Sequence, residues 1–136
     1  MNLLVIGLSH KTAPVEVRER AALTEAAREA ALTWLVAHTS ISEAMVLSTC
    51  NRVEFAVRGE PEEEAAAAIQ SLLPLENAGA YLYRHSQRDA VRHLFRVACS
   101  LDSMVVGEPQ ILGQVKQAYA AAKAAGTLCG PLEEVL

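Results

Sequence analysis

Two kinds of apolar pattern alternate along this chain and predict strands and helices in turn. Four short apolar runs, bounded by polar turns, are predicted as strands: residues 3–9, 43–50, 52–58 and 81–85. Pro14 and Pro61 are each expected to open a helix at its first position, over 15–20 and 61–73. Apolar residues at helical spacing predict a helix over 26–38. The main elements then follow the order β-α-β-β-α-β. We therefore predict an α+β fold, a ferredoxin-like βαββαβ sandwich with a four-stranded antiparallel sheet.

Two longer helices are predicted after the sheet. Residues 87–101 carry their apolar side chains on one face, and a second helix runs from Pro109 to about residue 125, with Gly126 as its C-cap. We divide the chain into a ferredoxin-like subdomain, residues 1–86, and a helical subdomain, residues 87–136. The two are expected to form one unit, with the helices completing a pocket.

Composition narrows the class of protein. The 136 residues, of which 51% are hydrophobic, suffice for one domain with a real core. The net charge of −4 argues against a dedicated nucleic-acid-binding domain. No segment approaches the roughly 20 apolar residues that span a bilayer, and the N-terminus lacks the features of a signal peptide. Three cysteines without paired spacing fit a reducing compartment, so we expect a cytoplasmic protein without membrane contact.

The candidate chemistry lies at the corner between the second and third predicted strands. A free cysteine is more often a small core residue than a nucleophile. Cys50, however, has the polar neighbours Thr49 and Asn51, which do not suit an inert core position. Arg52 would favour the thiolate, the reactive form, and its guanidinium is shaped to bind a carboxylate. The corner predicts Cys50 as a nucleophile and Arg52 as a carboxylate anchor.

Other polar residues leave alternatives open. His93 falls between the apolar and polar faces of its helix, either as a satisfied boundary histidine or as a polar group turned into the pocket. Arginines repeat every four residues, at Arg84, Arg88, Arg92 and Arg96. Such a run is usually a solvated face, but here it is the best candidate for phosphate contacts. Cys99 and Cys129 are interpreted as structural or incidental. No HExxH, CxxC or carboxylate cluster occurs, so no metal site is expected.

Three strings carry a resemblance to a known family. They are GLSHKTAPV (7–15), LSTCNR (47–52) and LDSMVVGEPQILGQVK (101–116). They resemble the N-terminal catalytic domain of glutamyl-tRNA reductase, from residue 1 to about 125. The resemblance implies that Cys50 attacks the aminoacyl ester of glutamyl-tRNA, forms a glutamyl thioester and releases tRNA. The family's enzymes are oxidoreductases, which then use NADPH to reduce the thioester to glutamate-1-semialdehyde. This reaction is the first step of tetrapyrrole (porphyrin, heme) biosynthesis by the C5 route.

The resemblance also implies roles for individual residues. His93 matches a histidine that supports activity. Substrate contacts are implied for Thr49, Asn51, Arg52, Ser103, Glu108, Pro109, Gln110 and Gln114. For the last five, plain capping of a helix N-terminus is the alternative. The chain departs from the family at Cys99-Ser100, where the family usually has Ser-Gly.

The same resemblance implies a cofactor and protein partners that other domains of the family's proteins would bind. NADPH would be bound by a domain not present here, because no GxGxxG occurs. The family homodimer would form through an absent C-terminal domain, so we expect this chain to be monomeric. The downstream semialdehyde aminotransferase is a further expected partner. We expect the isolated chain to form the thioester and hydrolyse it slowly, without reducing it.

Two other functions remain as alternatives. A cysteine-dependent esterase or thioesterase would share Cys50 but would act on substrates without a glutamyl group, so Arg52→Ala would have little effect. A non-enzymatic ferredoxin-like ligand-binding domain would form no covalent adduct, and Cys50→Ser would leave its binding intact.

Overall fold

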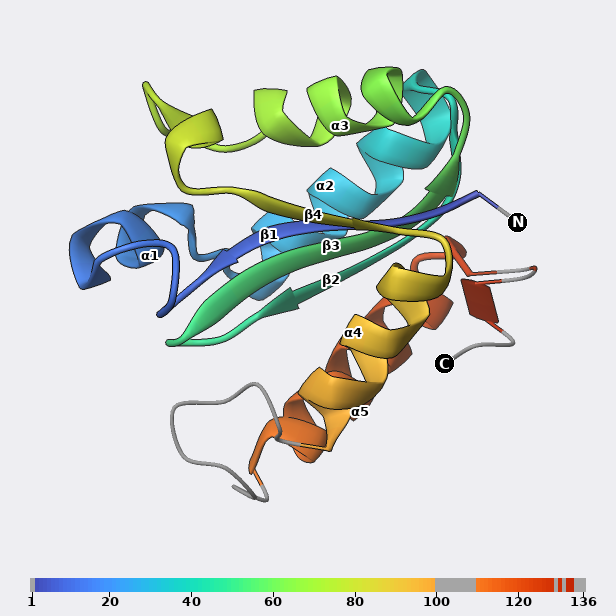
Figure 1. Ribbon diagram of the computed structural model, residues 1–136. Coiled ribbons are helices and arrows are strands. Elements are labelled where there is room, and N and C mark those ends of the chain that lie inside the picture. Colours follow the sequence, from blue (N-terminus) through green and yellow to red (C-terminus); the bar gives the residue numbers. More distant parts are fainter. Residues whose placement is uncertain (1, 100–109, 129, 131, 134–136) are drawn as a thin grey trace.

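The structure, a computed structural model, describes residues 2–99, 110–128, 130, 132 and 133. A four-stranded antiparallel sheet forms the middle layer (Figure 1). Its strands are β1 (Leu3–Ser9), β2 (Ile41–Ser48), β3 (Arg52–Gly59) and β4 (Tyr83–Ser86). They lie in the order β2-β3-β1-β4, with β1 and β3 in the centre. This is the strand order of a ferredoxin-like sheet, so the predicted α+β fold is confirmed.

Helices cover both faces of the sheet (Figure 1). The crossover helices are α2 (Glu25–His38) and α3 (Glu62–Ser71), on one face, and α4 (Arg88–Ala98) and α5 (Gln110–Ala124) lie on the other. Because the sheet is enclosed in this way, every residue of β1 is buried, as its continuous apolar run predicts. Among the described residues, no helix has the length and apolar character needed to cross a membrane.

Several element boundaries differ from the prediction. The short helix η1 (Ala78–Ala80) carries the chain up to Tyr81, so β4 begins at Tyr83 and not at residue 81. The strand β2 covers Ile41–Ser48, two residues earlier than expected. The helix α4 ends at Ala98, and the predicted end at residue 101 lies outside the described residues.

Individual residues at the helix ends explain where the helices begin and stop. Thr24 caps α2, because its side-chain oxygen accepts a hydrogen bond from the backbone N–H of Ala27 at 3.1 Å. Gly126 ends α5 with a φ of 75°, in the left-handed region that favours glycine. Pro14 and Pro61 stand at the N-cap positions of α1 (Val15–Ala21) and α3, and not at the first helical residue as predicted.

The segment after α5 is fastened to the edge strand β2. Glu43 is fully buried and accepts hydrogen bonds from the backbone N–H groups of Gly130, at 2.6 Å, and Leu132, at 2.9 Å. The same carboxylate binds Arg58 Nε at 2.7 Å. Thr127 also bonds to the backbone of β2, through its carbonyl and its side-chain hydroxyl. These contacts hold the C-terminal end of α5 on the sheet, and so help to fix where its N-terminal end lies.

Candidate functional site

Cys50 stands at the tip of the β2–β3 hairpin. The N–H of Thr49 donates to the carbonyl of Arg52 at 2.8 Å, so Cys50 and Asn51 form a two-residue loop. The Thr49 hydroxyl accepts hydrogen bonds from the N–H groups of Asn51 and Arg52, each at 3.1 Å. From outside the hairpin, the N–H of His10 donates to the carbonyl of Asn51 at 2.9 Å. The loop is held on two sides, while Cys50 is exposed as a free cysteine.

A small cavity of about 40 Å³ opens beside Cys50, between the hairpin and the first turns of α5. It is lined by Thr49, Cys50, Asn51, Arg52, Gln110, Ile111 and Gln114. Five residues with an expected substrate contact therefore lie together with the cysteine, although α5 is far from the hairpin in sequence. The remaining three, Ser103, Glu108 and Pro109, lie outside the described residues.

Arg52 is buried, and it is bound by an acid that the sequence analysis missed. Its side chain is 1% exposed, and its Nη1 lies 2.7 Å from Oε1 of Glu54, which is 2% exposed. Removing a guanidinium from water is costly unless a carboxylate compensates it. A glutamate within the apolar run of β3 was the signal that could have revealed this pair, because a buried acid needs partners.

Glu54 joins Arg52 to two further side chains. Its Oε1 accepts hydrogen bonds from His93 Nε2, at 2.6 Å, and from the hydroxyl of Tyr83. Burial is the largest single influence on the pKa of Glu54 and raises it. Three neighbours lower the pKa: His93 by its hydrogen bond and charge, Arg52 by its charge, and Tyr83 by its hydrogen bond. Together they outweigh burial, so the pKa of Glu54 lies below its ordinary value of 4.5. Glu54 is therefore held as a carboxylate.

His93 is buried and points from α4 towards the sheet. It does not lie at the solvent-exposed edge between the apolar and polar faces of the helix. The helix α4 packs on β1 and β4, which brings His93 over Glu54 and against His85, with 4.3 Å between the two imidazole centroids. His93 does not line the cavity beside Cys50. Its connection to that cavity runs through Glu54 and Arg52.

Gly7 makes room for the Glu54 side chain. In the sheet, Gly7 pairs with Glu54 of β3 on one side and with Tyr83 of β4 on the other. A Cβ atom at Gly7 would lie 2.4 Å from the carbonyl oxygen of Val53 and 2.9 Å from Cγ of Glu54. The missing side chain therefore lets the carboxylate extend across β1 to Tyr83.

We expect Gly7→Ala to lower the free energy of unfolding by about 1–3 kcal/mol, because the new methyl group meets backbone atoms that cannot move aside cheaply. Urea unfolding monitored by circular dichroism measures this. Gly113→Ala is the matched control: it lies in α5 with nothing within 4 Å of the added Cβ, so it should be neutral or stabilising. Equal stability of the two variants would contradict the packing argument.

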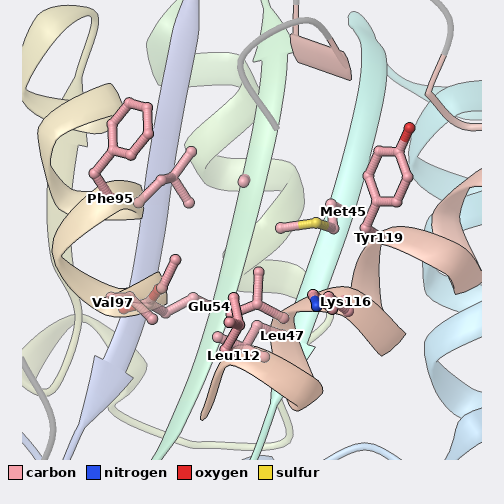
Figure 2. A pocket seen from close by; sticks show the side chains of 12 residues that line it. Met45, Leu47, Glu54, Phe95, Val97, Leu112, Lys116 and Tyr119 are labelled. Carbon is pink, nitrogen blue, oxygen red and sulfur yellow. The ribbon is translucent and has the colours of Figure 1, made fainter. Parts of the chain in front are cut away.

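A larger, mostly apolar cavity of about 220 Å³ lies between α4, α5 and the sheet (Figure 2). Its lining includes Met45, Leu47 and Leu112, and Glu54 and Lys116 are the charged residues among the described ones that line it. The cavity therefore borders the Glu54 network and not Cys50. Its apolar walls keep the carboxylate in surroundings of low polarity, where its hydrogen bonds to charged groups are strong.

The four arginines that repeat every four residues do not lie together on one surface. Arg84 lies on β4 and contacts Glu62 and Glu63 of α3, at 3.4 and 2.7 Å. Arg92 and Arg96 lie on α4 and line a separate polar cavity. The equal spacing in sequence conceals this division, because Arg84 belongs to a strand and the other arginines belong to the helix that follows it.

Fold and site together define a ferredoxin-like α+β domain that presents an exposed thiol beside a buried, carboxylate-bound guanidinium. The family model described as "Glutamyl-tRNAGlu reductase, N-terminal domain" matches residues 6–136. The chain belongs to this family.

Individual relatives agree with the family match. The glutamyl-tRNA reductase of Solibacter usitatus is 54% identical over 142 residues, which cover 100% of this chain and 34% of the relative. Glutamyl-tRNA reductase 2 of Koribacter versatilis is 50% identical, over 100% of this chain and 32% of the relative. The solved structure of glutamyl-tRNA reductase from Methanopyrus kandleri is similar with a TM-score of 0.82 and 37% identity, over 98% of this chain and 31% of that one. The chain thus spans about a third of the length of the relatives it matches.

Proposed function

We propose that this domain performs the acyl transfer of glutamyl-tRNA reduction. The sulfur of Cys50 attacks the ester carbonyl of glutamyl-tRNA, the bond from the carbonyl carbon to the ribose oxygen breaks, and the ribose hydroxyl leaves with a proton. The product is a glutamyl thioester on Cys50. An aminoacyl ester is already activated, so the thiolate needs no strong general base. The observation that carries the proposal is that the exposed Cys50 lines one cavity with the buried Arg52.

In this proposal Arg52 selects the glutamyl group. A planar guanidinium suits bidentate binding of a carboxylate, and the bond to Glu54 fixes its orientation. Asn51, Gln110 and Gln114 supply neutral hydrogen-bonding groups around the same cavity. His93 acts as a positioning residue, because it holds Glu54 and Glu54 holds Arg52. Thr49 shapes the loop, and the family resemblance adds Ser103, Glu108 and Pro109 as substrate contacts.

We assign the reduction step to other parts of the longer proteins. NADPH would supply the hydride that converts the thioester to glutamate-1-semialdehyde for tetrapyrrole synthesis. The described antiparallel sheet has no βαβ unit with the glycine-rich turn that binds a dinucleotide. We infer that the dimer contacts and the downstream aminotransferase also engage those other parts, and that this chain alone hydrolyses its thioester slowly.

Intact-mass spectrometry of the wild-type chain, after brief mixing with aminoacyl-tRNAs, tests the proposal. A glutamyl adduct should form with glutamyl-tRNA, while alanyl-tRNA, which lacks the side-chain carboxylate, should give little or none. Equal adducts with both would favour the esterase alternative. No adduct with either, from a chain whose Cys50 is still readily alkylated, would contradict acyl transfer and favour a binding domain.

A further inference from the structure

A third cavity, of about 370 Å³, is lined mainly by polar and cationic side chains. Its walls come from the end of β1 and the following turn, from β4, and from one face of α4. The lining residues are Ser9, Lys11, Thr12, Tyr83, His85, Asp89, Arg92, His93 and Arg96. Three cationic side chains therefore face one carboxylate, and two imidazoles lie among them. This local excess of positive charge stands out on a chain whose net charge is −4.

The cavity adjoins the Cys50 site through two connections. Ser9 pairs with Arg52 in the β1–β3 register, and the N–H of the next residue, His10, donates to the carbonyl of Asn51. The turn after β1 thus supports the Cys50 loop and also forms a wall of the cationic cavity. The second connection is His93, which lines this cavity and binds Glu54.

Arg92 and Arg96 have the arrangement of a phosphate-binding pair. They lie one helical turn apart on α4, where neighbouring side chains start about 5–6 Å from each other. Both are exposed, and neither forms an ion pair within the part of the chain that the structure describes. Arg52, Arg58 and Arg84, in contrast, are each bound to a glutamate. Guanidinium groups that face solvent across a polar cavity suit a phosphate oxyanion.

We propose that this cavity binds a backbone phosphate of the single-stranded acceptor end of the aminoacyl-tRNA, with Arg92 and Arg96 as its ligands. The inference rests on the proposed function, because the ester that meets Cys50 joins the glutamyl group to the last nucleotide of the tRNA. The phosphates of that end must therefore lie close to the thiol. The cationic cavity has, as one wall, the turn that supports the Cys50 loop, so it can neutralise one of these phosphates near the thiol.

Binding of a fluorescein-labelled RNA minihelix, made of an acceptor stem and its single-stranded 3′ end, provides the first test. By fluorescence anisotropy, the Arg92→Ala/Arg96→Ala variant should bind at least about tenfold more weakly than wild type at low salt. The slope of log affinity against log salt should become shallower by about 0.7, the contribution of one neutralised phosphate of a single strand. Arg88→Ala is the matched control, since Arg88 is exposed on the same helix but does not line the cavity. An unchanged slope in the double variant would overturn the proposal.

A competition experiment separates the two sources of a phosphate ester. NADPH also carries phosphates, and it is added to the wild-type chain with bound minihelix. We expect the minihelix to remain bound at NADPH concentrations well above that of the RNA. If equimolar NADPH displaces the RNA from wild type but not from the Arg92→Ala/Arg96→Ala variant, the cavity binds the dinucleotide. That result would overturn the RNA assignment.

Acylation distinguishes failure of this inference from failure of the proposed function. A phosphate-free activated glutamyl ester should acylate Cys50 equally in wild type and in the double variant, while glutamyl-tRNA should acylate the variant at least about tenfold more slowly. Equal losses with both substrates would overturn the phosphate assignment. If neither substrate acylates wild type but the arginine-dependent minihelix binding persists, the acyl-transfer proposal fails and the phosphate site stands.

Discussion

Replacing Cys50 by serine should abolish formation of the glutamyl adduct, with a rate at least about 10²-fold below wild type. A serine hydroxyl needs a general base, which typically contributes 10²–10⁴-fold. The described residues that line the cavity beside Cys50 include no imidazole and no carboxylate. A thiolate can react there without a base, whereas a hydroxyl cannot. The substitution is nearly isosteric at an exposed position, so the free energy of unfolding should be unchanged.

The measurement is a time course of intact mass after mixing each variant with glutamyl-tRNA. Cys99→Ser is the matched control, because Cys99 is also exposed and free but lies at the end of α4, where it lines none of the three cavities. The control should form the adduct at the wild-type rate. An adduct that forms on Cys50→Ser and is lost from Cys99→Ser would move the nucleophile to the second cysteine.

The parts of the fold that could be predicted from the sequence are those with local causes. A strand enclosed on both faces must be apolar throughout, and β1 shows this over its whole length. The position of Cys50 in a tight loop between β2 and β3 was also predictable, because two apolar runs meet there with a few adjacent polar residues between them. The start of β4 was not, because Tyr81 and Leu82 have strand-like side chains but form the irregular connection between η1 and β4.

The parts of the site that escaped prediction depend on contacts between distant residues. Glu54 meets Tyr83 and His93, which are 29 and 39 residues away in sequence. A histidine on α4 gives no sign of which strand lies beneath it until the strand order is known. Gly7 gives even less indication, since its role is to leave space for the side chain of Glu54. Neither hydrophobic periodicity nor a short motif contains information about contacts between residues that are distant in sequence.

Replacing Glu54 by glutamine should have the second large effect, on stability and on acylation together. Removing the charge of one partner in a buried ion pair typically costs about 3–5 kcal/mol, and Arg52 and His93 would both lose their carboxylate. Tyr83→Phe is the graded control, because it removes one neutral donor to the same oxygen and should cost about 1 kcal/mol. Urea unfolding at neutral pH measures both variants.

A second measurement on Glu54→Gln tests its positioning role. Alkylation of Cys50 by iodoacetamide should remain close to wild type, because the thiol is exposed and Glu54 does not line its cavity. Acylation by glutamyl-tRNA should fall sharply, and the preference over alanyl-tRNA should be lost, because Arg52 is no longer held in place. Acylation and alkylation that decline in parallel would indicate a general loss of structure instead.

The pH dependence of the stability loss identifies the ionised carboxylate as its cause. The folded-state pKa of Glu54 lies below its ordinary value of 4.5, so the ion pair adds stability that is fully present above that value. This contribution disappears as the pH falls through the lowered pKa, where wild-type Glu54 becomes neutral as well. The difference in unfolding free energy between wild type and Glu54→Gln should therefore be largest at neutral pH and shrink below 4.5. A difference that stayed constant into acid would mean that packing alone, and not charge, links His93 to Arg52.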